Sequence, residues 1–264
     1  MAVGARSVER ALRLLKELSS HGEFGWRLSD LSRQVGLDRA TCHRMLKRFV
    51  SEGFAERRAE DLKYYPGQTL FEMGLAVPQY AVLREQVDPA LHRLAQRTAC
   101  IASFLLRSGD DLVCVYQQRA GLELSGMLIR VGTRRPLITS VAGLAILQQL
   151  PADEADRIAA ENTQRELRRG GERRLEKLER MRRRSDARGF GFTVGDFAPG
   201  LAAVAVPVRS AAGEPFAALI LTGTDTVITE ATAASLHAQL VQEAAGIEAE
   251  AARCLRRAPA KFTD

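Results

Sequence analysis

An amphipathic helix with one apolar and one cationic side constrains this chain more than any other feature of its sequence. Its buried side is predicted from apolar residues spaced i, i+3, i+4 and i+7, which are Cys42, Met45, Leu46 and Phe49. The opposite side carries a small residue among hydrogen-bond donors and cations, which are Ala40, His43, Arg44 and Lys47. Gly53 follows as a helix stop. Residues 39–52 are therefore predicted to form a helix whose apolar side packs on the core and whose cationic side can bind an anion.

The segments around this helix follow the order of a winged helix-turn-helix. An earlier helix is predicted over residues 7–18, with Ser7 as its N-cap. The apolar stripe expected to be buried along it consists of Val8, Ala11, Leu12 and Leu15. A second helix is predicted over residues 28–35 and is ended by Gly36. After the third helix, alternating residues that turn at about 59–62 predict a short hairpin.

Positive charge is concentrated in this amino-terminal part, which we take as a domain over residues 1–67. The whole chain has 38 Lys and Arg against 32 Asp and Glu, and residues 1–67 hold 13 and 9 of these. Residues 39–48 contain four cations and no acid. Lys and Arg neutralise phosphates, and Arg also binds the guanine edge bidentately in the major groove. Double-stranded DNA is therefore the partner that we expect for this domain.

The predicted DNA contacts fall into two groups. Contacts with bases or phosphates are expected from the helix, at Arg39, Thr41, His43, Arg44 and Lys47. Contacts with backbone phosphates are expected from the hairpin, at Arg57, Arg58 and Lys63. A second basic segment at residues 157–188 interleaves 12 cations with 6 acids, which favours a solvated helix surface over a second nucleic-acid or partner surface.

The rest of the chain predicts a linker helix and an α+β domain. Residues 68–83 are helical in pattern, with an interruption at Pro78, and apolar on a wide face, so we expect this linker helix to pack against its own copy in a dimer. The second domain is expected over residues 84–258. Its strand-like runs are at 101–108, 111–118, 124–131, 201–210 and 214–223. Its helical runs are at 83–96, 140–150, 153–188 and 229–255. Strands with hairpin-type connections between helices predict an antiparallel sheet covered by helices.

Catalysis, metal binding and membrane insertion find little support. The sequence has no G-x-S-x-G elbow, P-loop or H-E-x-x-H motif, and G-x-G at residues 189–191 is interpreted as a loop. The four histidines and four cysteines show no ligand spacing, so we expect no cofactor and no metal. Reduced thiols favour a cytoplasmic location, and no apolar run is long enough for a membrane helix. Cys100, Cys114 and Cys254 are interpreted as core or surface thiols, and a redox role of Cys42 is open but disfavoured.

Taken in order, these segments resemble the IclR family of transcriptional regulators over nearly the whole chain. The family's winged helix is similar to SVERALRLLKEL, LSDLSRQVGLDRATCHRMLKRFVSEGF and KYYPG. The signature of its ligand domain resembles GTRRPLITSVAGLAILQQLP, and the module after its basic helix resembles RSDARGFGFTVGDFAPGLAAVAVPVRSAAGEPFAALILTG. The resemblance implies a GAF-like domain that binds a small organic-acid effector. It also implies a homodimer or a dimer of dimers.

Carried over position by position, the resemblance implies an effector pocket at Ser140, Val141, Ala142, Asp196, Ala203, Ile220 and Thr222. The helix predicted at 140–150 could seat a carboxylate on its first N–H groups, or Thr139 or Ser140 could merely cap it. Asp196 could orient a hydroxyl or a cation, or be a turn residue. Because most of these positions are apolar, we expect an aromatic or medium-chain acid.

The chain departs from the family pattern at three positions. Leu144 stands where the ligand-domain signature often has Lys, Pro66 where a Leu commonly precedes the last Gly of the wing, and Arg27 where Ser or Thr usually opens the second helix. The function expected is a ligand-responsive regulator, a repressor or an activator, of an adjacent catabolic operon. Two alternatives remain at this point, which are a small-molecule-metabolising enzyme and an architectural DNA-binding protein without a ligand.

Overall fold

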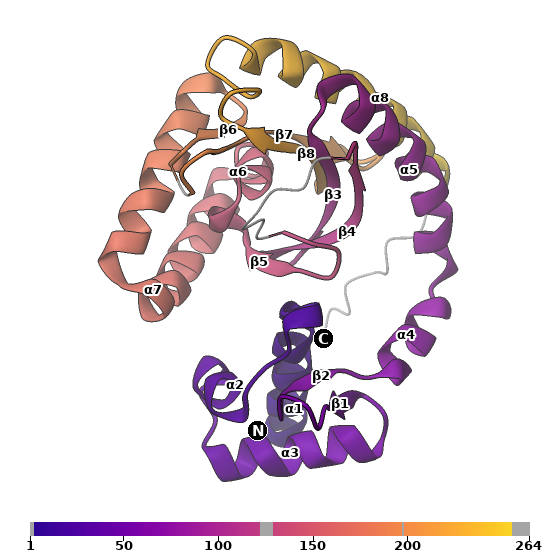
Figure 1. Cartoon of the computed structure of the whole chain (residues 1–264), viewed down its shortest axis with the longest axis vertical. Coiled ribbons are helices and arrows are strands. Elements are labelled where there is room, and N and C mark those ends of the chain that lie inside the picture. The colour runs from indigo at the N-terminus through magenta and orange to yellow at the C-terminus, as the bar shows by residue number, and fades with distance from the viewer. Residues whose placement is uncertain (1–2, 122–128, 197, 255–264) are drawn as a thin grey trace. The chain divides into compact units, whose positions relative to one another are not determined.

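The computed structural model describes residues 3–121, 129–196 and 198–254 (Figure 1). The chain divides into two compact units. One contains the residues up to Pro78 together with Gly132–Arg134, and the other contains the rest of the chain from Gln79 on. Each unit has a hydrophobic core of its own, so each is described separately.

The first unit has the predicted order of helices and hairpin (Figure 1). Its elements are α1 (Val3–Ser20), η1 (Gly22–Phe24), α2 (Leu28–Val35), α3 (Arg39–Ser51), β1 (Ala55–Arg57), β2 (Tyr64–Pro66) and α4 (Gln68–Leu75). The strands β1 and β2 pair in antiparallel fashion and form the wing. The predicted winged helix-turn-helix is therefore confirmed.

The turn between α2 and α3 is defined by the residues at its two ends. Gly36 closes α2 in the left-handed conformation at φ 64°, which costs a glycine little. Asp38 caps α3, because its carboxylate accepts a hydrogen bond of 2.8 Å from the backbone N–H of Thr41. Because Gly36 ends α2 and Asp38 begins α3, the turn between the two helices is short. Cys42 and Leu46 of α3 are fully buried, as the spacing of its apolar residues predicts.

The prediction for α1 was wrong in its start and only partly correct in its buried face. The helix begins at Val3, so Ser7 lies within it and is not its cap. Val8 and Leu12 are 58% and 54% exposed, whereas Leu14 and Leu18 are fully buried. Leu15 of the predicted stripe packs against the same core as Leu14 and Leu18, so the buried face overlaps the predicted one at its C-terminal end only.

The second unit is built on a six-stranded sheet whose order is β5-β4-β3-β8-β7-β6. Its strands are β3 (Ile101–Ser108), β4 (Asp111–Arg119), β5 (Arg134–Pro136), β6 (Gly191–Val194), β7 (Leu201–Arg209) and β8 (Pro215–Thr224). Its helices are α5 (Pro78–Thr98), η2 (Leu137–Thr139), α6 (Val141–Leu147), α7 (Ala152–Arg188) and α8 (Ala233–Cys254). The α+β architecture with an antiparallel sheet agrees with the prediction.

Helices cover both faces of this sheet (Figure 1). On one face, α5 and α8 bury Phe104, Phe192 and Val204 in the larger core. On the other face, η2, α6 and α7 pack over a second core that includes Cys114 and Ala205. Alternate residues of each strand therefore serve opposite cores, which explains why these strands are apolar almost throughout.

The edges of the sheet differ from the sequence-based expectation. In the run predicted as a strand at 124–131, residues 124–128 lie outside the described part and residues 129–131 are not a strand. The edge strand is instead β5. At the other edge, Gly191 opens β6 where a loop was expected. A glycine is required at this position, because a Cβ there would lie 2.1 Å from the carbonyl oxygen of Val141. In the linker region, Pro78 begins α5, so the linker segment 68–83, whose helical pattern is interrupted at this proline, spans two helices.

Candidate nucleic-acid interface and ligand pocket

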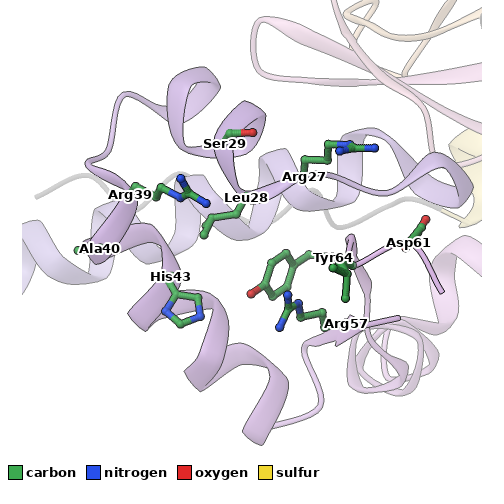
Figure 2. A pocket seen from close by; sticks show the side chains of 10 residues that line it. Arg27, Leu28, Ser29, Arg39, Ala40, His43, Arg57, Asp61 and Tyr64 are labelled. Atoms are coloured by element: carbon green, nitrogen blue, oxygen red, sulfur yellow. The ribbon is translucent and has the colours of Figure 1, made fainter. Parts of the chain in front are cut away.

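The first unit carries a hollow between its two central helices and the wing (Figure 2). Its volume is about 730 Å³. It is lined by Arg27, Leu28 and Ser29 from the start of α2, by Arg39, Ala40 and His43 from α3, and by Arg57, Asp61, Leu62 and Tyr64 from the wing. Three arginines against one aspartate give the hollow a positive charge, which suits a polyanion.

The residues predicted on α3 lie on its exposed side. Arg39, His43, Arg44 and Lys47 are exposed, and Thr41 is half-buried. The guanidinium of Arg44 donates to the hydroxyl of Thr41 at 3.3 Å, and this bond orients the arginine along the helix surface. The N–H of Thr41, its hydroxyl and the charge of Arg44 together lower the pKa of the Asp38 carboxyl, which keeps the cap ionised.

The three predicted cations of the wing are held by protein groups to different degrees. Arg57 is exposed, lines the hollow and lies 5.6 Å from the centre of the Tyr64 ring (Figure 2). Arg58 covers the ring of Tyr65 at 3.8 Å and donates to a carboxylate of the wing at 3.1 Å. Lys63 donates to a backbone carbonyl oxygen of η1 at 2.9 Å. Arg58 and Lys63 therefore stabilise the wing itself, and a phosphate would have to compete with these bonds.

Arg27 is a candidate that the sequence reasoning did not assign to DNA binding. It is exposed, opens α2 without a side-chain capping bond, and lines the same hollow as Arg39 and Arg57 (Figure 2). A helix start without a capping side chain leaves first-turn N–H groups available to an anion. The sequence did contain a signal for this role, which is the presence of Arg27 where the family usually has Ser or Thr. The change replaces a side chain that caps the helix with one that carries a positive charge.

The second unit contains a smaller cavity of about 90 Å³ between the sheet and the η2–α6 junction. Of the seven predicted pocket residues, five line this cavity, and they are Ser140, Val141, Ala203, Ile220 and Thr222. Ala142 and Asp196 are not among its lining residues. Residues far apart in the sequence are therefore brought to one place, on the pocket-facing side of β3, β4, β7 and β8.

Both residues outside the lining have structural roles. The N–H of Ala142 donates to the hydroxyl of Ser140 at 3.2 Å, so Ser140 caps α6. Asp196 accepts hydrogen bonds from Arg184 at 2.8 Å and from Thr193 at 3.0 Å, and its side chain is only 7% exposed. The hydrogen bond to Asp196 raises the pKa of Arg184. The loop after β6 is thereby fastened to α7.

The lining also contains polar residues that the sequence reasoning missed. Gln117 of β4 donates to the hydroxyl of Ser103 at 3.0 Å and to the carbonyl oxygen of Ile129 at 3.2 Å. Arg135 of β5 lines the same cavity, and burial lowers its pKa to about 10. The pocket is more polar than the seven predicted positions suggested. Leu144, the other departure in this region, is buried in the core.

The described part of the chain shows no sign of a metal centre or a membrane span. No group of three or more His, Cys, Asp or Glu side chains within it could hold a metal ion. None of its helices combines the length and apolar character needed to cross a bilayer. Cys42, Cys100 and Cys114 are buried, and burial raises the pKa of Cys42 to about 11 and that of Cys114 to about 12. These thiols are protonated at neutral pH and shielded from oxidants.

Two family models match the chain. The IclR helix-turn-helix domain matches residues 7–59, and the bacterial transcriptional regulator IclR C-terminal model matches residues 76–249. The HTH-type transcriptional regulator BhcR of Paracoccus denitrificans is 25% identical over 248 residues, which cover 91% of this chain and 85% of that protein. The acetate operon repressor of Salmonella typhimurium is 26% identical over 241 residues, which cover 90% of this chain and 87% of that protein. These relatives are regulators of transcription and not enzymes.

Solved structures share the fold. The IclR transcriptional regulator from Alicyclobacillus acidocaldarius aligns with a TM-score of 0.66 at 23% identity, covering 95% of this chain and all of that one. An IclR homologue from Microbacterium hydrocarbonoxydans, crystallised with 4-hydroxybenzoate, aligns with a TM-score of 0.64 at 22% identity. The alignment covers 93% of this chain and 98% of that one.

Proposed function

The chain belongs to the IclR family of bacterial transcriptional regulators, and we propose that it binds an operator through its first unit and a small organic acid through its second. The observation that carries the DNA-binding part is the positive hollow between α2, α3 and the wing, beside the exposed cations of α3. In this proposal, α3 enters the major groove with Arg39, Thr41, His43, Arg44 and Lys47 toward the bases and adjacent phosphates. Arg27 and Arg57 contact phosphates on the two sides of the groove.

A small acid is the effector class that the pocket supports. The cavity lies on the sheet face covered by η2 and α6, and it includes one arginine among hydroxyl and apolar side chains. The homologue crystallised with 4-hydroxybenzoate shares this fold, which supports an acid ligand for this chain as well. The preference for an aromatic acid stays a prediction, since it was argued from the apolar positions alone.

A second copy of the chain is the partner that we propose for α4. Phe71, Met73 and Leu75 on this short helix are 68%, 57% and 67% exposed, and no residue of α4 is buried. An apolar patch of this kind favours association. A symmetric dimer formed here would present two copies of α3 to half-sites about 34–36 Å apart on DNA.

Regulation would follow from linkage between the two ligands. An acid that binds one arrangement of the dimer more tightly than another shifts the population toward that arrangement. The operator then binds more or less tightly by the same coupling free energy. We place the connection in the linker formed by α4 and the start of α5, because it joins the two units in sequence.

A gel-shift experiment tests this proposal. The probe is the DNA upstream of the chain's own coding sequence, with and without pyruvate, lactate, glyoxylate and 4-hydroxybenzoate. We expect a shifted band whose intensity changes with at least one acid. A shifted band that no acid alters would favour the architectural alternative over the ligand-responsive regulator.

A further inference from the structure

The tip of the wing holds a leucine in a backbone conformation that leucine seldom adopts. Leu62 has φ 59°, in the left-handed region where a Cβ crowds the backbone. Within the described part of the chain, Leu62 and Ala99 are the two residues other than glycine with a positive φ. Two backbone hydrogen bonds of 3.1 Å close the turn, from the N–H of Leu62 to the carbonyl oxygen of Arg58 and from the N–H of Arg58 to that of Lys63. Glycine or asparagine would fit this turn with less strain.

Side chains next to Leu62 hold the turn in this shape. The carboxylate of Asp61 accepts hydrogen bonds from the Tyr65 hydroxyl at 2.6 Å and from the N–H of Lys63 at 3.0 Å. These two bonds lower the pKa of the Asp61 carboxyl, so it is ionised at neutral pH. The guanidinium of Arg58 covers the buried ring of Tyr65 at 3.8 Å. Leu62 therefore stands on a braced support, which is what keeps a strained residue in place.

Burial does not explain why this position carries a leucine. Leu62 is 60% exposed, and it is not one of the residues that form the core of the first unit or pack against it. Its side chain therefore adds little to the folding of the wing, whereas its backbone conformation costs stability. An exposed apolar side chain on a strained backbone is typical of a contact with another molecule.

The place of Leu62 on the first unit indicates what that molecule is. Leu62 lines the positive hollow from the side of the wing, as Arg57 does, and Arg39 and His43 line it from α3 (Figure 2). A DNA strand that borders the major groove occupied by α3 would fit in this hollow, because the arginines neutralise its phosphates. In duplex DNA a single strand separates a major groove from the neighbouring minor groove, so the tip of the wing comes to lie at the minor groove.

We propose that Leu62 enters the minor groove beside the half-site and wedges open a base step there. Apolar side chains that insert into the minor groove unstack a step and bend the duplex. Pyrimidine–purine steps unstack most easily, so the wing selects such a step without a hydrogen bond to a base. This inference rests on the proposed function and adds to it a residue that determines operator specificity through the deformability of the DNA.

Leu62→Gly in the full-length protein distinguishes a wedge from a residue that supports the wing. Glycine adopts the left-handed conformation without strain, so the variant should unfold at the same or a higher urea concentration than the native protein, as followed by Trp26 fluorescence. Its affinity for duplex DNA from upstream of the chain's own coding sequence should nevertheless fall about tenfold, with an unchanged salt dependence because no phosphate contact is lost. The bend, measured by the gel mobility of circularly permuted fragments, should decrease.

Two further variants complete the experiment. Leu62→Asn keeps a residue that tolerates the left-handed conformation but removes the apolar side chain, so it should lose affinity and bending as Leu62→Gly does. Ala99→Gly is the matched control, because it relieves the same backbone strain at an exposed position of the second unit and should leave both quantities unchanged. Replacing a pyrimidine–purine step beside the half-site with a stiff A-tract step should weaken the native protein more than Leu62→Gly.

Several results would overturn the wedge. Equal affinity and equal bending for Leu62→Gly and the native protein would remove it and leave the regulator intact. Unfolding of Leu62→Gly at a lower urea concentration would make the leucine a support of the wing. A loss of affinity accompanied by dissociation in sedimentation equilibrium would place Leu62 between two copies of the chain. A native protein that forms no saturable complex with DNA would overturn the proposed function and the wedge together.

Discussion

At the scale of single residues, Arg44 is the side chain that we expect to read a base. It is exposed on α3 and oriented by Thr41. Arg44→Ala should cost about 1–3 kcal/mol of binding free energy on the preferred operator, and the loss should differ among operator variants. Fluorescence anisotropy with a set of single-base operator variants measures the loss of affinity on each of them. Arg48→Ala is the control, because Arg48 of the same helix pairs at 3.0 Å with Glu52, the residue just after its end. A uniform loss across variants would make Arg44 a phosphate contact.

Asp38 gives a prediction for the pH dependence of the first unit. Its pKa is lowered in the folded state, chiefly by the N–H of Thr41, so its ionised form stabilises the start of α3. This stabilisation is present above the ordinary pKa of 3.8 and is lost as the pH falls through the lower folded value. Asp38→Ala should therefore unfold at lower urea concentration than the native protein at pH 7, and the difference should shrink in acid.

Fluorescence of Trp26 follows this unfolding, since it is the single tryptophan of the chain and is buried in the first unit. Asp30→Ala, in the first turn of α2, provides a control that removes an equal charge without a cap. A difference between Asp38→Ala and the native protein that persisted unchanged at low pH would contradict the role of the ionised cap.

What the sequence could predict about single residues depends on how local their contacts are. The exposure of Arg44 and the burial of Cys42 follow from helical spacing within one element. The roles of Lys63 and Asp196 do not, because Lys63 binds the backbone of η1, 39 residues earlier, and Asp196 binds Arg184 across a strand and a loop. Partners brought together by the fold leave no periodic trace in the sequence.

At the scale of elements, the contact between α6 and η2 is expected to be the least tolerant of change. A Cβ at Gly143 would lie 1.9 Å from the carbonyl oxygen of Leu137. Gly143→Ala should therefore destabilise the second unit by about 1–3 kcal/mol or more through overpacking. Gly246→Ala, in α8, meets nothing within 4 Å and should be neutral or stabilising by about 0.5–1 kcal/mol.

Differential scanning calorimetry of the two variants measures this contrast, and Trp26 fluorescence shows whether the first unit is affected. The transition of the first unit should be unchanged in both. Equal unfolding temperatures for Gly143→Ala and Gly246→Ala would show that α6 can move away from η2, and the tight packing described for the pocket wall would then be wrong.

Elements were predictable where their pattern was long and repeated. The bounds predicted for α2 and β3 agree with the structure, because each has a clear period and a clear stop. The edge strands β5 and β6 are three and four residues long and contain glycine, proline or arginine, so pairing and not composition makes them strands. The stripe of α1 was only partly correct, because tertiary packing and not spacing distinguishes two overlapping apolar faces.

At the scale of the whole molecule, the exposed apolar face of α4 predicts dimer-dependent DNA binding. Phe71→Glu should dissociate the protein to monomers and weaken binding to a two-half-site operator by about a hundredfold, since the second contact is no longer intramolecular. Sedimentation equilibrium and anisotropy measure the two effects. Leu167→Glu, at another exposed apolar position, is the matched control. A Phe71→Glu protein that remains dimeric would show that α4 is not the interface.

The order of elements and the family were predictable from the sequence, because the helix-turn-helix pattern and the ligand-domain segments are colinear with it. The five predicted residues that line the cavity were carried over from the family resemblance. Arg135 was not, because its place in the pocket depends on the edge strand β5 and its electrostatic surroundings depend on the break at Gly171. Neither feature has a signature in residue spacing.

The most direct test is fluorescence anisotropy with labelled duplex DNA from upstream of the chain's own gene, titrated at several salt concentrations. The account predicts a saturable complex whose affinity falls steeply as salt rises, because cations of α3 and the wing displace counterions from phosphates. It also predicts that an acid binding in the second unit changes this affinity. Binding that does not saturate, or that is indifferent to salt, would contradict the assignment of the first unit to DNA.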